Sequence, residues 1–169
     1  MTKKILITGG CGFVGSNLGI FLKKKGFDIT SLDNLYRSGS KLNLKRLKKE
    51  KIDNLRIDIT SFNKVDKIKK KFDLVIDCCA EPSVEKSKKS IYEARRVFNT
   101  NLSGTFNIIS KCIKDKSKLI FLSSSRVYSI LGLKKYKNEI KKKIFTKKFD
   151  KLIKKLVSKL QLKNDVFVH

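Results

Sequence analysis

The sequence is poor in the residues that build several common kinds of functional site. It contains one proline, no tryptophan and a single histidine, His169, which is the last residue. None of its four cysteines (Cys11, Cys78, Cys79 and Cys112) belongs to a Cys-x-x-Cys pair. Because clustered imidazole and thiolate ligands are lacking, we expect no metal site. We expect the cysteines to be buried free thiols in a reducing compartment.

Long apolar runs are also absent. No stretch of about 18 apolar residues occurs, so the sequence predicts no membrane-spanning helix. The N-terminus has Lys3 and Lys4 and continues directly into an apolar run and a glycine turn, without the cleavage site of a signal peptide. We therefore expect a cytoplasmic protein, and its 169 residues, 40% of them hydrophobic, suffice for one domain with a core.

Acidic residues are scarce, with 15 Asp and Glu against 41 Lys and Arg and a formal net charge of +26. Such a charge points first to a polyanion such as nucleic acid or an acidic membrane. However, most of the bases are lysines, whereas arginine favours bidentate phosphate and base recognition. They are also spread along the chain, with few aromatic residues between them to stack on bases. We therefore do not expect nucleic acid as a partner, and a compositional bias of the coding DNA would also explain the charge.

The most informative stretch is the glycine-rich segment of residues 3–18. A short apolar run, Ile5–Ile7, precedes Gly9, Gly12 and Gly15, and apolar residues then recur at helical spacing. A strand, a glycine turn and a helix in this order are the parts of a dinucleotide site. The backbone N–H groups that begin the helix would face the phosphates. The alternative is that the glycines only mark a flexible turn.

A second dinucleotide signal is Asp33, which ends a predicted strand over residues 27–33. It lies about 20 residues beyond the glycine turn, the spacing at which a carboxylate meets the adenosine ribose. A carboxylate there would repel a 2′-phosphate, so it favours NAD over NADP. Arg37 would favour the opposite choice, but we expect Asp33 to decide. The alternative is that Asp33 is a simple turn residue.

Alternating strands and helices fill the rest of the chain as far as residue 123. We predict strands over 3–8, 27–33, 54–58, 73–79 and 117–123. We predict helices after the glycine turn to about Gly26, around Leu42–Leu47, over Val65–Phe72 and from Ile91 to Lys114, with a polar loop over Asn34–Asn43. This rhythm is typical of an α/β protein with a Rossmann-like, doubly wound parallel sheet. Asp77 is the one residue that does not suit its buried strand.

Six segments carry a family resemblance. They are TGGCGFVGSNL (8–18), LDN (32–34), DIT (58–60), AEPSV (80–84), NTNLSGTFNII (99–109) and SSSRVYS (123–129). Through them residues 3–133 resemble the extended short-chain dehydrogenase/reductases of the NAD-dependent sugar epimerase/dehydratase family. Within it they are most similar to the CDP-paratose 2-epimerase (tyvelose epimerase) branch. The resemblance implies bound NAD and redox epimerisation of a nucleotide-linked sugar through a keto-sugar.

The resemblance also implies the roles of particular residues. Those that would contact NAD are Gly9, Gly12, Phe13, Val14 and Gly15 at the pyrophosphate, Asp33 and Asn34 at the adenosine ribose, Asp58 and Ile59 at adenine, and Cys78, Cys79, Ala80, Asn101 and Ser123 along the rest of the cofactor. Ser124 would be catalytic and would hydrogen-bond the reacting hydroxyl of the sugar. Without the resemblance, Asp58 is more simply a turn or N-cap residue.

The sequence departs from the family at the catalytic base, a tyrosine in a Tyr-x-x-x-Lys pair. Tyr136 has Ile140 at the fourth position and Lys141 one position too far, and no other tyrosine fits. The sugar-binding domain is also missing from the sequence. We therefore expect an NAD-binding portion that is inactive alone, either truncated or completed by a partner chain or homo-oligomer. The alternative is a non-catalytic NAD-binding or interaction module.

The last 36 residues, 134–169, form a lysine-rich tail that we separate from an NAD-binding domain over 1–133. The tail carries 13 lysines against three acidic residues. Its apolar residues recur at three- and four-residue steps over 149–160, which predicts a basic amphipathic helix. Three interpretations remain open: packing on the sheet edge, binding to a membrane surface or partner helix, and a partly disordered tail.

Overall fold

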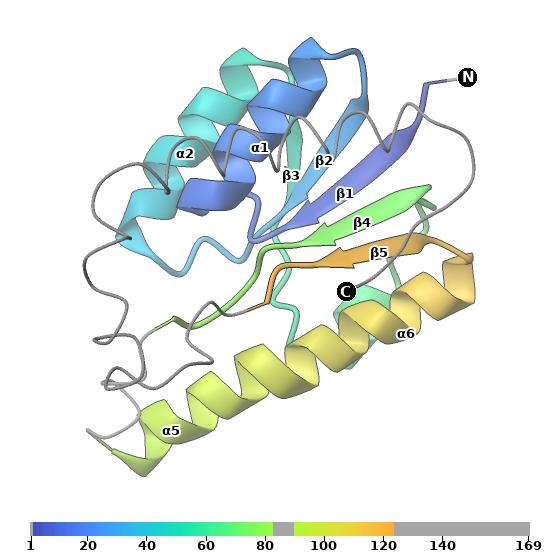
Figure 1. The fold of residues 1–169 in the computed structure, drawn as a ribbon. Helices are drawn as coiled ribbons and strands as arrows, with labels where there is room; N and C mark the ends of the chain where they lie inside the picture. Colours follow the sequence, from blue (N-terminus) through green and yellow to red (C-terminus); the bar gives the residue numbers. More distant parts are fainter. Residues whose placement is uncertain (1, 83–89, 124–169) are drawn as a thin grey trace, which may run out of the picture. The chain divides into compact units, whose positions relative to one another are not determined.

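The structure is a computed structural model that describes residues 2–82 and 90–123 (Figure 1). Its five strands form one sheet in the order β3-β2-β1-β4-β5, and each neighbouring pair is parallel. The strands are β1 (Lys4–Thr8), β2 (Asp28–Leu32), β3 (Asp53–Leu55), β4 (Leu74–Asp77) and β5 (Lys118–Phe121). Since the order reverses beside β1, the carboxyl ends of β1, β2 and β4 meet at a switch point. The predicted Rossmann-like parallel sheet is confirmed.

Helices cover both faces of this sheet, as Figure 1 shows. They are α1 (Phe13–Lys24), α2 (Ser38–Lys49), α3 (Phe62–Asp66), α5 (Ile91–Phe98) and α6 (Thr105–Asp115), with the π-helical segment η1 (Asn99–Gly104) joining the last two. The helices α1 and α2 lie on one face, and α3 and α6 lie on the other. The connections therefore wind in both directions from the central strand.

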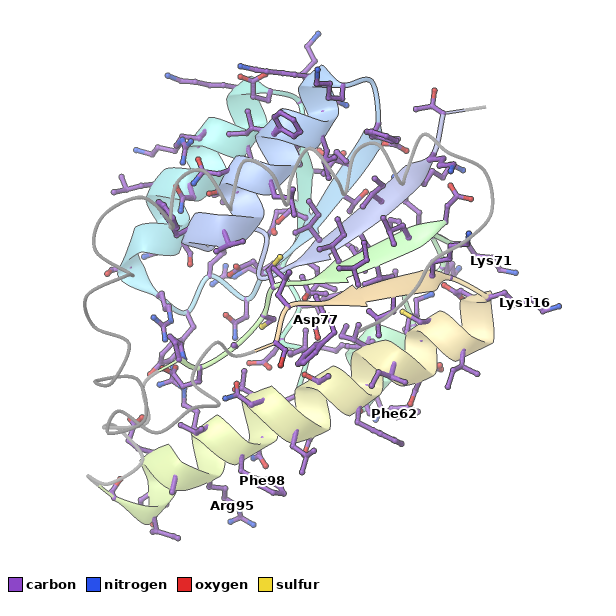
Figure 2. The ribbon with its side chains drawn as sticks, viewed as in Figure 1. Phe62, Lys71, Asp77, Arg95, Phe98 and Lys116 are labelled. Atoms are coloured by element: carbon purple, nitrogen blue, oxygen red, sulfur yellow. The ribbon has the colours of Figure 1, made fainter. Side chains whose placement is uncertain are left out.

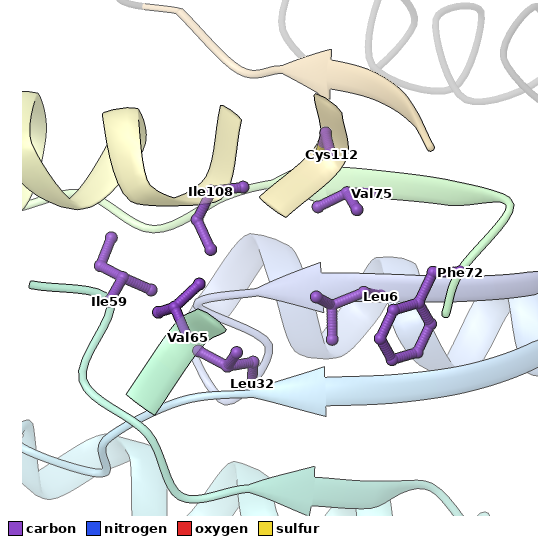
Figure 3. Close-up of a cluster of buried hydrophobic side chains, with 8 residues drawn as sticks. All are labelled: Leu6, Leu32, Ile59, Val65, Phe72, Val75, Ile108 and Cys112. Carbon is purple, nitrogen blue, oxygen red and sulfur yellow. The ribbon is translucent and has the colours of Figure 1, made fainter. Parts of the chain in front are cut away.

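Successive residues of β1 illustrate the two core layers. Ile7 lies against α1, where a Cβ built on Gly19 would be 3.5 Å from the Ile7 Cδ1 atom. Leu6 points to the opposite face and joins the cluster drawn in Figure 3. That cluster consists of Leu6, Leu32, Ile59, Val65, Phe72, Val75, Ile108 and Cys112. Burial on both faces explains why the central strands β1 and β4 each carry a run of three apolar residues.

Two connections differ from the prediction. The helix predicted over Val65–Phe72 ends at Asp66, and Phe72 lies in the following loop, where it is buried in the core. Phe72 is spaced from Val65 as in a helix only because both side chains pack in the same core. The polar loop predicted over Asn34–Asn43 is also shorter, because α2 already begins at Ser38. Observed strand ends lie up to three residues inside the predicted ones, except that β3 begins at Asp53, one residue before its predicted start.

The long helix predicted from Ile91 to Lys114 extends to Asp115, but it contains the π-helical turn η1. An apolar repeat does not reveal such a turn, because one widened turn changes the periodicity very little. The boundary predicted at residue 133 and the tail lie outside the described residues. Within the described part, no helix is long and apolar enough to cross a membrane.

Candidate functional site

The glycine turn after β1 folds tightly against two neighbouring segments. Gly9 has a φ of +58°, and a Cβ there would lie 2.8 Å from the Cys78 carbonyl oxygen. A Cβ on Gly15 would lie 2.4 Å from the Gly9 carbonyl oxygen. Both contacts are with backbone, which cannot move aside as a side chain would. Glycine is therefore required at both positions by close approach, and Gly9 also by its left-handed conformation.

The turn presents the start of α1 as an anion site. Its N-cap, Gly12, is extended, and no side chain accepts a hydrogen bond there. The backbone N–H of Ser16 is the first that bonds back to the Gly12 carbonyl, at 3.0 Å. The N–H groups of Phe13, Val14 and Gly15 thus have no helical acceptor. The first turn contains no acidic residue, so the positive end of the helix dipole is not neutralised locally.

Asp33 lies just beyond β2 and is held by the backbone. Its Oδ2 atom accepts a hydrogen bond from the Cys11 N–H at 3.1 Å, and its Oδ1 atom accepts one from the Leu35 N–H at 2.8 Å. An ionised carboxylate has about four acceptor positions, so about two are left for ligand hydroxyls. Burial raises the pKa of Asp33, while these two bonds and the positive charge of Arg37 oppose that shift.

Asp58 is linked to Asn34 across the mouth of the site. The Asn34 side-chain amide donates to Asp58 Oδ2 at 2.7 Å, and the Thr60 N–H and hydroxyl donate to Oδ1 at 2.9 Å and 2.7 Å. Burial raises the pKa of Asp58, but these hydrogen bonds outweigh burial and place it below its usual value. Asp58 is therefore a turn residue that also faces the site.

A cavity of about 640 Å³ opens between these elements. Its lining includes twelve of the residues that the sequence assigns to the cofactor: Gly9, Gly12, Phe13, Val14, Gly15, Asp33, Asn34, Asp58, Ile59, Cys78, Cys79 and Ala80. Asn101 and Ser123 are not part of this lining, and Ser124 lies outside the described residues. Strand order thus brings together residues as far apart in the chain as Gly9 and Ala80.

Asn101, which is predicted to lie along the cofactor, bonds in this structure to the backbone of the loop after β4. Its side-chain oxygen accepts a hydrogen bond from the Glu81 N–H at 2.8 Å, and its amide donates to the Glu81 carbonyl at 3.1 Å. It therefore holds the loop that follows β4. Ser123 is exposed just beyond β5.

Three residues of the site have no role assigned to them by the sequence: Tyr36, Arg96 and Glu81, although Glu81 lies in the segment 80–84 that carries the family resemblance. Each lines the cavity, and Glu81 is only 4% exposed. Glu81 forms ion pairs with Arg96 and with Arg37, and Arg96 lies over the Tyr36 ring. Glu81 follows β4, and Arg96 lies on α5, 15 positions later. No local spacing rule relates two such positions. The ion pair between Glu81 and Arg96 is apparent only in the folded structure, where Glu81 is buried.

Asp77 is the last residue of β4 (Figure 2), and Cys78 and Cys79 directly follow it. Asp77 is 1% exposed and accepts hydrogen bonds from the Thr8 hydroxyl and the Cys79 N–H. Its other oxygen, Oδ2, has no hydrogen-bond partner within the described ranges, and burial raises the pKa of this carboxyl. Burial also raises the pKa of both Cys78 and Cys79 to about 12, so neither is a thiolate nucleophile at neutral pH.

The parallel sheet, the glycine turn and the carboxylate after β2 together define a Rossmann-like dinucleotide-binding protein. The chain belongs to the NAD dependent epimerase/dehydratase family, which matches residues 5–144. The family resemblance drawn from the sequence is thereby confirmed, and NAD is the cofactor named in the family's own description.

Curated relatives include several nucleotide-sugar enzymes. The chain is 35% identical over 128 residues to UDP-N-acetyl-alpha-D-glucosaminuronate decarboxylase of Bacillus cytotoxicus, covering 76% of this chain and 38% of that one. It is 34% identical over 139 residues to CDP-paratose 2-epimerase of Salmonella typhi, covering 79% and 40%. The chain therefore spans about two fifths of the length of these relatives.

Solved structures show the same fold. One is Pal from Bacillus thuringiensis, with a TM-score of 0.67 and 30% identity, covering 75% of this chain and 40% of that one. Another is UDP-glucose 4-epimerase from Bifidobacterium longum in complex with NAD+ and UDP. It has a TM-score of 0.65 and 26% identity, covering 75% and 38%. The relatives thus agree on the family but differ in the sugar nucleotide that their names give.

Proposed function

We propose that this chain binds NAD in the cavity and is the NAD-binding portion of an enzyme that converts a nucleotide-linked sugar. The observation that carries this proposal is the meeting of two groups in one cavity. The uncapped N–H groups at the start of α1 suit a pyrophosphate, and the Asp33 carboxylate retains acceptor positions for ribose hydroxyls. Bound NAD would supply the hydride acceptor and donor for a redox step.

The remaining lining has matching chemistry. Ile59 offers an apolar surface for adenine, and the adjacent Asp58 carboxylate can accept from an amino group. Cys78 and Cys79 stay protonated, so they line the cavity as neutral, weakly polar groups. The chain thereby orients the cofactor, while its own sequence supplies no Tyr-x-x-x-Lys pair as a general base. We infer that it does not turn over a sugar nucleotide by itself.

For the sugar, we propose a CDP-paratose-like nucleotide and redox epimerisation through a keto-sugar. The match to CDP-paratose 2-epimerase supports this choice, as do the sequence segments 8–18, 80–84 and 123–129. UDP-sugars are the competing class, because a decarboxylase and 4-epimerases that act on UDP-sugars by name match at similar identity. The proposed location remains the cytoplasm, where sugar nucleotides would be encountered by such an enzyme.

Titration calorimetry with NAD tests the cofactor proposal. Asp33→Ala is expected to weaken binding about tenfold or more, because hydrogen bonds to a charged acceptor contribute about 1.5–3 kcal/mol. Asp53→Ala, which removes an exposed carboxylate from the start of β3, is the matched control and should bind like the wild type. A folded wild-type chain that binds no NAD at millimolar concentration would refute the proposal. Turnover of CDP-paratose by the purified chain would refute the inferred inactivity.

A second candidate function is a non-catalytic module that docks through its tail. It is favoured by the 13 lysines against three acidic residues in 134–169 and by the apolar repeat over 149–160. Such a tail would bind an acidic partner or an anionic membrane surface. Flotation with anionic vesicles should show binding that salt weakens. Binding that is indifferent to salt would contradict electrostatic docking.

A further inference from the structure

We propose that Glu81 is a specificity-determining residue that favours NAD over NADP by keeping Arg37 from binding a 2′-phosphate. The inference rests on the proposed NAD site and refines it. Asp33 is the residue that the sequence itself indicates for this choice, and Arg37 is the residue that would oppose it. The structure shows that Arg37 is already engaged by another carboxylate.

The carboxylate of Glu81 uses both oxygens for arginine. Its Oε1 atom lies 2.6 Å from the Nη2 atom of Arg37, and its Oε2 atom lies 2.7 Å from the Nη2 atom of Arg96. The Glu81 side chain is 3% exposed, whereas that of Arg37 is 49% exposed. The Arg37 side chain is therefore exposed enough to contact a ligand, but it is paired with the buried Glu81 carboxylate.

Glu81 is itself held in place by Asn101 at its backbone and by Arg96 at its carboxylate. Asn101, on the π-helical turn η1, bonds to both the N–H and the carbonyl of Glu81. Arg96 is fixed in turn, because its guanidinium lies 3.8 Å from the centroid of the Tyr36 ring, within the range of a cation–π contact. Asn101 thus holds the Glu81 backbone and Arg96 holds one carboxylate oxygen, so Arg37 has a fixed partner.

Arg37 lies where a cofactor phosphate would compete for it. It is the N-cap of α2, four residues after Asp33, and both residues line the cavity. An arginine in this region is the usual partner of a 2′-phosphate. Pulling Arg37 away would leave a buried carboxylate with one of its two charge partners, which is costly. Glu81 and Asp33 therefore both disfavour NADP. Glu81 does so by pairing with Arg37, and Asp33 does so by repelling the 2′-phosphate.

The test compares the dissociation constants of NAD and NADP by calorimetry. Glu81→Gln is expected to strengthen NADP binding about tenfold and to change NAD binding by less than about threefold, because the released Arg37 can meet the 2′-phosphate. The matched control is Glu50→Gln, which alters a surface pair with Lys24. Arg37→Ala added to Glu81→Gln should cancel the gain, which a general loosening of the site would not do.

If Glu81→Gln does not fold, as judged by circular dichroism, Glu81→Asp replaces it. That variant keeps the buried charge but shortens the reach to Arg37, and a smaller gain in NADP affinity is expected. An unchanged NADP affinity in a variant that still binds NAD would overturn the inference and leave the proposed function intact. A gain that persists after Arg37→Ala would overturn it as well. A wild-type chain that binds neither nucleotide would overturn the proposed function and this inference with it.

Discussion

The carboxyl and amino ends of the sheet differ in how strictly the structure requires particular residues. At the carboxyl end, Gly9, Asp33, Asp77 and Glu81 each have a defined backbone conformation or a defined set of partners. At the amino end, the connections carry exposed lysines, and Figure 2 shows Lys71 and Lys116 extending from it. Further exposed lysines that flank these connections are Lys4, Lys24, Lys25, Lys51, Lys69 and Lys118.

Backbone conformation at the amino end shows the same tolerance. Lys51 follows α2 with a φ of +55°, and Lys116 ends α6 with a φ of +58°. Glycine is the usual residue in this left-handed region, since a side chain there costs about 1–2 kcal/mol. The chain accepts lysine at both positions, whereas at Gly9 the neighbouring Cys78 backbone excludes any side chain. Close packing around the cavity, and not turn geometry alone, is what demands a particular residue.

The largest expected effect is that of Gly15→Ala in the glycine turn. Its new Cβ would lie 2.4 Å from the Gly9 carbonyl oxygen, so the turn must shift. We expect the free energy of unfolding to fall by about 2–3 kcal/mol, the cost of overpacking, and NAD binding to be lost. Gly39→Ala is the matched control, because nothing lies within 4 Å of its added Cβ. Urea unfolding measures the stability, and calorimetry measures NAD binding. Equal stability and equal NAD binding of the two variants would contradict a special requirement for glycine at position 15.

An intermediate effect is expected for Asp77→Asn at the end of β4. The pKa of Asp77 is raised above 3.8 by burial, so the folded state keeps its proton where the unfolded state has lost it. Stability contributed by this group is therefore lost as the pH rises from about 3.8 through the folded pKa. Asparagine does not ionise, and its amide can donate toward the Thr105 hydroxyl, the side chain whose hydrogen bonding opposes the rise in the pKa of Asp77. We expect a gain of about 1 kcal/mol at neutral pH.

Urea unfolding of wild type and Asp77→Asn at pH 5 and pH 8 measures this effect. Asp33, whose pKa burial also raises, contributes equally to both proteins, so the difference between them isolates Asp77. Asp53→Asn, the same carboxylate-to-amide change at an exposed position, is the matched control variant. A variant that is less stable than wild type at pH 8 would show that Asp77 is a stabilising anion.

The smallest expected effect is that of Lys116→Gly at the amino end. Relief of the left-handed strain, less the entropy that glycine adds to the unfolded chain, should raise the free energy of unfolding by about 0.5–1 kcal/mol. Lys45→Gly, on the exposed side of α2, is the control of opposite sign and should lower it by about 1 kcal/mol. Thermal unfolding measures both changes. A loss of stability in Lys116→Gly would mean that the lysine side chain contributes contacts that outweigh the strain.

Much of the cavity was predictable from the sequence because its signals are local. The apolar runs, the glycine turn and Asp33 all depend on backbone conformation and burial within short segments. The five strands and their parallel direction followed from the same alternation. The end of α3 did not, because Phe72 keeps a helical spacing from Val65 only by packing on the same core. The π-helical turn is likewise invisible in an apolar repeat.

The sequence by itself determined the class of site: a glycine turn, a carboxylate after the second strand and an absent Tyr-x-x-x-Lys pair. Only the tertiary structure decided which charges meet. Glu81 is paired with Arg37, 44 residues away, and with Arg96, 15 residues away, and its backbone is held by Asn101. The physical reason is that the order of the strands determines which loops lie together at the carboxyl edge of the sheet. No local sequence pattern encodes that order, so none predicts which charged residues form a buried ion pair there.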